Sequence, residues 1–131
     1  MIKILSAVYA IFLDNIGITG IVQDRIFPNI VPDKDDNGNT IDYPLIVINR
    51  SALTPTTTKN EGCSQDTAAV EVICYSVSYF EAIDMAELVR DELEWFKGEA
   101  NGIKIDKTRF TSIDEGFSNG AYFQRLVFTF K

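Results

Sequence analysis

The residues that come closest to a recognisable chemistry lie in an acidic segment, DKDDNG, at positions 33–38. They match the first half of the calcium-binding EF-hand loop, which has acids at positions one and three, asparagine at five and glycine at six. Position twelve, where that loop requires a glutamate that binds through both oxygens, is Pro44. We therefore predict no calcium site at Asp33, Asp35 and Asn37, and interpret the segment as an acidic turn.

A second group of carboxylates recurs along positions 79–97 at intervals of three and four residues. Its members are Glu81, Asp84, Glu87, Asp91 and Glu94. This spacing places them on one side of a helix, opposite its apolar stripe, as is typical of a surface that faces solvent or a partner. Two carboxylates can also act as a catalytic acid and base, but helical exposure explains the pattern without a further assumption.

The sequence contains few other residues or motifs typical of catalysis. It contains no histidine, which is the commonest general base and the commonest ligand of transition metals. It also lacks a G-x-S-x-G nucleophile pattern and a glycine-rich phosphate loop after a strand. We predict that the protein is not an enzyme and uses no catalytic residue, metal or cofactor; a small enzyme of an unfamiliar type is kept as a third hypothesis.

The composition favours one acidic domain. A chain of 131 residues can bury a core without disulfides or metals, so we predict a single domain over residues 1–131. With 12 basic and 19 acidic residues, the net charge of -7 disfavours a protein that grips phosphate backbones. Cys63 and Cys74 show no CxxC spacing, and free thiols are the expectation.

The apolar run Ile4–Leu13 follows a single basic residue, Lys3. It is too short to cross a bilayer before Asp14 interrupts it. A signal peptide is the competing interpretation, but it would carry a more basic start and a clean small-residue cleavage site. We expect a core helix over 2–16 and no membrane partner. The predicted buried face of this helix consists of Ile2, Leu5, Tyr9, Phe12 and Ile16.

The segment Ala68–Lys97 organises the rest of the chain. It begins with a strand whose even-numbered positions, from Ala68 to Cys74, are all apolar and predict one buried face. Ser78 and Glu81 then form a capping-box pattern that predicts a helix from about 79 to 97, ended by Gly98. The apolar side of this helix comprises Tyr79, Ala82, Ala86, Val89, Leu93 and Phe96.

Shorter patterns complete the fold. We predict a connector over 17–44, strands over about 45–50, 106–113 and 122–130, and a long polar loop over 51–67. Asn119-Gly120, within a loop over 116–120, is typical of a β-hairpin turn. These elements predict an α+β fold in which an antiparallel sheet of about four strands carries two helices (about 2–16 and 79–97) packed on one face.

The second face of this sheet is unusually apolar. Its apolar residues are Ile73, Tyr75, Val77, Phe123 and Val127. Three explanations remain open at this point: the first helix covers part of the face, the residues are scattered exposed apolars, or the face is a subunit interface.

The ordered set of features resembles the tail-completion, or tail-terminator, proteins of long-tailed bacteriophages and their prophage relatives. The resemblance covers nearly the full length and rests on an apolar N-terminal helix, the segments DRIFP at 24–28 and YPLIV at 43–47, a polar loop, an alternating strand, a helix and a closing aromatic strand at 122–128. Two positions depart from the pattern. Gln23 replaces the usual glycine, and the acidic insertion at 33–42 is longer than usual.

The resemblance implies a structural protein of the virion that is present in the host bacterial cytoplasm during assembly. Members of that family look like small α+β domains that assemble as a ring, generally hexameric, at the head-proximal end of the tail tube. The implied partners are further copies of the chain, the tail tube protein and the head connector protein, while DNA passes through the lumen without specific binding. The alternative is a monomeric ligand- or ion-binding module that uses the acidic loop 33–42.

Candidate interface residues follow from the apolar sheet face and from the polar loop, which is long enough to reach a neighbour. They are Ile73, Tyr75, Phe123, Val127, Thr56, Thr57, Thr58 and Lys59.

Overall fold

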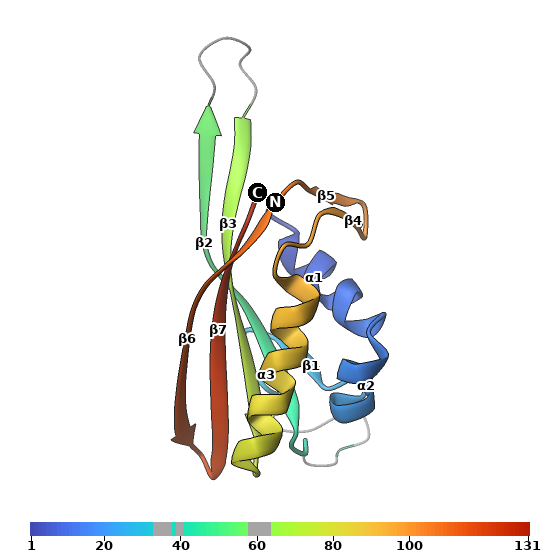
Figure 1. Ribbon diagram of the computed structural model, residues 1–131, viewed down its shortest axis with the longest axis vertical. Coiled ribbons are helices and arrows are strands. Elements are labelled where there is room, and N and C mark those ends of the chain that lie inside the picture. Colours follow the sequence, from blue (N-terminus) through green and yellow to red (C-terminus); the bar gives the residue numbers. More distant parts are fainter. Residues whose placement is uncertain (33–37, 39–40, 58–63) are drawn as a thin grey trace.

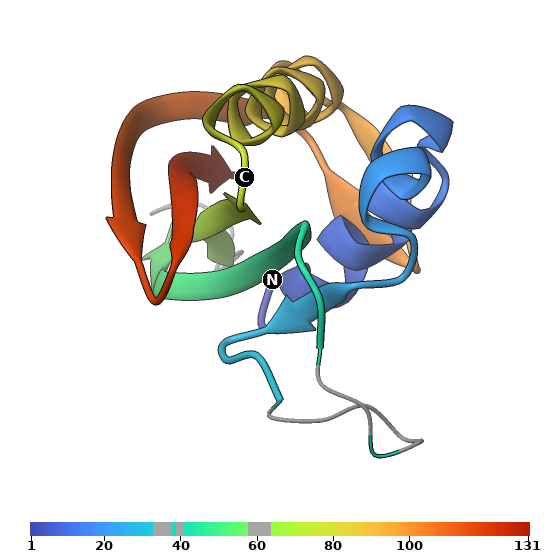
Figure 2. The ribbon, with the colours of Figure 1, turned by 90° about the horizontal axis from the view of Figure 1, so that it is seen from below.

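A computed structural model describes residues 1–32, 38, 41–57 and 64–131. The chain forms an α+β fold in which a curved sheet of five strands carries three helices on one side (Figures 1 and 2). The elements are α1 (Ile4–Leu13), α2 (Ile16–Val22), β1 (Ile26–Pro28), β2 (Leu45–Thr57), β3 (Ser64–Ser76), α3 (Tyr79–Leu93), β4 (Gly98–Ala100), β5 (Ile103–Ile105), β6 (Thr108–Ser118) and β7 (Ala121–Phe130).

The strand order in the main sheet is β1-β2-β3-β7-β6, and β4 and β5 form a separate two-stranded ribbon. All pairings in the main sheet are antiparallel except that of β1 with β2. The sheet therefore has one strand more than the four predicted. β1 has three residues and ends in a proline, so it leaves no alternating pattern in the sequence.

The two N-terminal segments that carry the family resemblance lie side by side. β1 is part of DRIFP, β2 begins in YPLIV, and Ile26 pairs with Ile46. Arg25 ties the segments together through its Nε, which donates to the Pro44 carbonyl oxygen at 2.8 Å. The motif arginine thus fixes the start of β1 against the start of β2.

The predicted strand and helix at the centre of the chain are present, with the predicted buried faces. The even-numbered side chains of β3 from Ala68 to Ser76 are fully buried. On α3 the buried residues are Ala82, Met85, Ala86, Val89 and Leu93, so the expected stripe is confirmed at four positions and gains Met85. Ser78 accepts a hydrogen bond from the Glu81 backbone N–H at 3.5 Å, while the Glu81 carboxylate accepts one from the Ser76 hydroxyl at 2.7 Å.

Helix α3 ends at Leu93 and not at about Lys97, so this predicted boundary is wrong. Glu94 is extended, and Trp95 has a φ of 68°. The Trp95 backbone N–H donates to the Thr108 carbonyl oxygen at 3.2 Å, which diverts the chain toward β6. A contact with a distant strand therefore ends the helix, and Gly98 instead begins β4.

The predicted N-terminal helix over 2–16 is α1, which ends at Leu13, and the predicted connector over 17–44 begins with a second helix, α2, at a bend of 90° to α1. Asn15 begins the second helix, because its side chain accepts a hydrogen bond from the Ile18 backbone N–H at 3.0 Å. The predicted buried face is confirmed at Phe12, with Leu5 and Tyr9 partly buried, but it is wrong at Ile2 and Ile16, which are 70% and 87% exposed. The residues that α1 buries are Ile4, Ala7, Val8, Ile11 and Phe12.

The predicted polar loop over 51–67 is mostly strand, which is a further correction. Beyond a bulge at Ser51, the ladder between β2 and β3 continues from Ala52–Ala69 to Thr57–Ser64. Its threonines are β-branched and suit an extended backbone. At the far end of the sheet, the Asn119-Gly120 turn is confirmed, with φ values of 53° and 80° at its two residues.

Burial predicts that Leu93→Ala destabilises the protein by about 2–5 kcal/mol, because it leaves a cavity in the cluster that contains Val70 and Val72. Glu87→Ala on the exposed side of α3 should cost less than about 0.5 kcal/mol. Urea unfolding of both variants measures the difference. Equal losses of stability would show that α3 does not bury this side.

Gln23 ends α2 with a φ of 57° and a ψ of -119°, a conformation that glycine adopts easily and other residues do not. We expect Gln23→Gly to raise the free energy of unfolding by about 1 kcal/mol, because relief of strain exceeds the entropy that glycine loses on folding. Gln23→Ala is the control, since it removes the hydrogen bond between Gln23 and Arg25 but keeps the strain. Thermal melts that rank Ala at or above Gly would contradict this account.

Candidate assembly surfaces

Four of the predicted interface residues lie together on the outer face of the sheet, which is the face turned away from the helices. They are Ile73, Tyr75, Phe123 and Val127, and all are half-buried. Tyr75 pairs with Phe123 across the ladder, and their ring centroids are 5.8 Å apart. The Tyr43 ring extends this row at 6.3 Å from Tyr75.

Part of the outer face is covered by the chain between β1 and β2. Asn29, Ile30, Val31 and Tyr43 line a hollow together with three residues of the face (Val47, Ile73 and Tyr75) and Asn119. Burial in this region raises the pKa of Tyr75, and Tyr43 raises it further, while Arg125 acts in the opposite direction. Helix α1 packs on the other side of the sheet, so the explanation that the first helix covers this face is wrong.

An ion pair between Arg125 and Asp114 lies in the middle of the outer face. Arg125 donates to both oxygens of Asp114, from Nε at 3.0 Å and from the terminal nitrogen at 2.6 Å. These hydrogen bonds raise the pKa of Arg125 above its ordinary value. The pair joins β6 to β7 in a fixed register, and because both groups are about half exposed its contribution to stability is small.

Strands β2 and β3 extend past the rest of the sheet as a two-stranded arm, at the top of Figure 1. The last β3 residue that pairs with β7 is Ala68, so the arm beyond it has no third strand. Thr56 and Thr57 lie in this part of β2, and their side chains are not described; Thr58 and Lys59 lie outside the described residues. A two-stranded ribbon is marginally stable alone, so the arm is suited to pairing or packing with another surface.

An exposed group of aromatic rings lies at the opposite end of the molecule, where α3 begins and the β6–β7 hairpin turns. Tyr79 contacts Phe80 and Tyr122 edge-on, each with centroids 5.6 Å away, and Phe117 lies 4.9 Å from Tyr122. Phe80 is 75% exposed and Phe117 is 62% exposed. No pattern in the sequence predicts this aromatic end, and its one signal is the aromatic residues on both sides of the Asn119-Gly120 turn.

Glu115 fixes the aromatic end through two hydrogen bonds. The Tyr79 hydroxyl and the Gln124 side-chain amide both donate to its Oε2 at 2.8 Å. These donors, Gln124 first, lower the pKa of Glu115, and the same contact raises the pKa of Tyr79. The carboxylate therefore links the first turn of α3 to both strands of the hairpin.

One groove among the described residues is mainly apolar. A groove of about 450 Å³ between α1 and the start of the sheet is lined mainly by apolar side chains, among them Leu5, Leu13, Ile26 and Ile48. Burial raises the pKa of the Cys74 thiol to about 12, which keeps it protonated and unreactive. Cys63 lies outside the described residues.

Some of the candidate metal ligands lie in the described part of the chain and others lie outside it. Within the described ranges, no three His, Cys, Asp or Glu side chains are grouped so that they could hold a metal ion. Asp33, Asp35 and Asn37 of the acidic segment lie outside those ranges, so the absence of a calcium site there stays a prediction. Among the described residues, no single helix is long and apolar enough to cross a membrane; α1 and α2 reach that length only as a bent pair.

Comparison with solved structures finds chains of similar fold. The fold is similar to that of a chain in a virion structure. The matching chain belongs to a structure described as "Virion of native gene transfer agent (GTA) particle", with a TM-score of 0.78 and 12% sequence identity over 95% of this chain and 90% of that one. No protein-family model matches this chain, and no curated protein matches it in sequence. The likeness therefore establishes the fold, and membership of the tail-terminator family stays a prediction.

The hydrogen bonds at Glu115 predict a pH dependence of stability. Because its pKa is lower in the folded state, Glu115 stabilises the fold above its ordinary pKa, and this contribution is lost as the pH falls through the folded value. The stability difference between wild type and Glu115→Gln should be constant near neutral pH and shrink in acid. Urea unfolding across that range measures the difference.

The Gln124→Ala variant serves as the control for this pH dependence. It removes the first donor, so the Glu115 pKa measured by NMR should rise toward its ordinary value. A Glu115 pKa that is unchanged in Gln124→Ala would contradict the assignment.

Proposed function

We propose that this protein is a structural assembly protein of a phage-like virion that completes the tail. It acts as a ring of identical subunits that caps the tail tube and joins it to the head connector, with no catalytic step. The observation that carries the proposal is the likeness in fold, over nearly the whole chain, to a component of a gene transfer agent virion. The resemblance of its segments 24–28 and 43–47 to tail-terminator proteins supports the more specific role.

The surfaces of the subunit fit such a role. A terminator must contact copies of itself at its sides and two different partners at its two ends. The arm lies at one end of the long axis and the aromatic end lies at the other, so the two ends differ in shape and chemistry (Figure 1). Exposed apolar groups of this kind on a small domain usually mark protein contacts.

The acidic balance fits a ring that encloses DNA. A net charge of -7 keeps phosphate contacts weak, so DNA can move through the lumen without being held. In this function the carboxylates along α3 are surface groups, and the absence of histidine carries no cost because no proton transfer is required.

Removal of the arm tests the proposal. Replacing residues 54–67 with an Asn-Gly turn would connect Leu53 directly to its cross-strand partner Ala68. We expect the shortened protein to remain folded, because the deleted residues lie beyond the last pairing with β7. In a phage that depends on this protein, we expect tails of uncontrolled length or tails that fail to join heads, visible by electron microscopy.

A double variant of one cross-strand pair, Thr54→Ser with Thr67→Ser, keeps the arm and serves as the control. Normal tails with the shortened protein would show that the arm is dispensable. Wild-type protein that neither caps tubes nor restores a terminator-deficient phage would refute the proposed function. Wild-type protein that stays monomeric and binds calcium would favour the ligand-binding alternative.

A further inference from the structure

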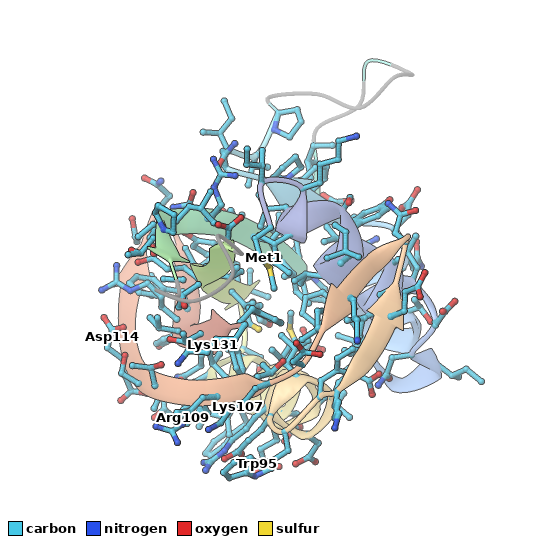
Figure 3. The ribbon with its side chains drawn as sticks, turned by 90° about the horizontal axis from the view of Figure 1, so that it is seen from above. Met1, Trp95, Lys107, Arg109, Asp114 and Lys131 are labelled. Atoms are coloured by element: carbon cyan, nitrogen blue, oxygen red, sulfur yellow. The ribbon has the colours of Figure 1, made fainter. Side chains whose placement is uncertain are left out.

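One end of the outer sheet face carries three cations in an otherwise acidic protein. Lys107 just before β6, Arg109 at its start and Lys131 after β7 line one hollow together with Thr111 and Thr129. Figure 3 looks onto this end and labels the three basic residues near one another. All three side chains are exposed, and within the described residues none of them forms an ion pair with a carboxylate. We call these three residues the basic group.

The basic group is arranged in an unfavourable way for an isolated subunit. Lys107 and Lys131 face each other across the ladder, since each backbone N–H donates to the other's carbonyl oxygen, at 3.1 and 2.8 Å. Like charges directly opposite each other destabilise a strand pair. Arg109 lies two residues along on the same face, and Asp106, the nearest acid in sequence, pairs instead with Lys104 at 3.9 Å. An external anionic surface would relieve this repulsion.

The exposed side of α3 supplies such a surface on the same chain. Phe80, Asp84, Glu87 and Asp91 are all exposed, and their spacing of four, three and four residues aligns them in one stripe. The only basic residue beside them on the helix, Arg90, is bound to Glu94 at 2.7 Å and lies over the Phe110 ring at 4.4 Å. The three carboxylates are therefore left to face outward. We call these four residues the acidic stripe, with Phe80 at its apolar end.

The two surfaces match along the long axis of the molecule. β7 and α3 both run from the aromatic end toward the opposite end, so the order of side chains along them can be compared. The outer sheet face begins with Tyr75 and Phe123 and reaches the basic group about 20–26 Å further along. The stripe begins with Phe80 and ends at Asp91 about 16 Å further along. Lysine and arginine side chains are long enough to bridge the difference to Asp91, so the basic group meets the stripe at its Asp91 end.

We propose that the outer sheet face of one subunit packs against α3 of a second copy, with the basic group of the first facing the acidic stripe of the second. The partner is another copy of this chain, and the proposal rests on the ring of the proposed function. Because the two surfaces differ, the contact is heterologous, and repeating it closes a ring or extends a filament rather than stopping at a dimer. The apolar ends of both surfaces meet at the same end of the molecule.

Charge reversal on each surface tests this contact. The sheet variant carries Lys107→Glu, Arg109→Glu and Lys131→Glu; the helix variant carries Asp84→Lys, Glu87→Lys and Asp91→Lys. In sedimentation experiments at low salt we expect wild type to self-associate, and we expect each variant alone to associate at least about tenfold more weakly because like charges then face each other. An equimolar mixture of the two variants should recover association, since every contact in an alternating ring again joins opposite charges.

A control variant with Lys3→Glu and Lys97→Glu has the same net charge as a two-residue sheet variant with Lys107→Glu and Arg109→Glu, but it changes exposed lysines outside both surfaces. It should associate like wild type. Circular dichroism checks that each variant folds; the single changes Arg109→Glu and Glu87→Lys replace any triple variant that does not. Raising the salt concentration should weaken wild-type association.

The interface is wrong if wild type stays monomeric under these conditions, if it forms only dimers, or if either variant associates as strongly as wild type. Failure of the mixture to recover association would also overturn it. The proposed function has its own readout, because tail length in the infected cell reports capping whichever surfaces form the ring. Normal tails with both variants would reject this interface and leave the proposed function standing.

Discussion

The burial of β3 is the constraint on which the rest of the structure depends. This strand pairs with β2 on one edge and with β7 on the other, and its even-numbered side chains from Ala68 to Ser76 lie fully buried beneath the helices. A shift in register by one residue would turn Glu71 and Tyr75 into the core, so the pairing of the neighbouring strands is fixed as well. The Ser76 hydroxyl, at the end of this strand, donates a hydrogen bond to Glu81 in the first turn of α3 and so links the two elements.

A helical layer on one side leaves the two broad sides of the domain unlike each other. The outer sheet face combines half-buried aromatic and aliphatic side chains with one tight ion pair, and the segment 29–31 covers only part of it. The side formed by α3 presents carboxylates and one exposed phenylalanine. A self-complementary dimer requires one surface to match itself, whereas unlike surfaces on opposite sides favour head-to-tail contacts.

The sequence was sufficient where its patterns excluded alternatives. Strict alternation in β3 and the polar–apolar division of α3 each permit one orientation, and both orientations are correct. Residues 2–16 are apolar on nearly every side, so the pattern could not fix which side of α1 is buried or reveal the break before Asn15. The end of α3 depends on a hydrogen bond from Trp95 to Thr108, which no local pattern contains.

The candidate surfaces were also predictable only where a local sequence pattern determines them. Ile73, Tyr75, Phe123 and Val127 could be placed on one face because strand alternation alone determines it. The aromatic end joins the first turn of α3 to a hairpin about 40 residues later, and only the tertiary fold brings Tyr79 next to Tyr122. The arm was hidden because a polar, threonine-rich sequence has no apolar alternation to detect.

The elongated shape of the subunit suggests how a ring of subunits stops the growth of a tail tube. When subunits pack side by side about an axis parallel to their long axis, all the arms point one way and all the aromatic ends point the other (Figure 1). Cyclic symmetry keeps the two faces of such a ring unlike, whereas dihedral symmetry would make them identical. A ring with one face that binds a growing tube and another that does not copy the tube's own contact stops growth by geometry alone. In the proposed function, the orientation of the surfaces on each subunit serves this requirement and no reacting group is needed.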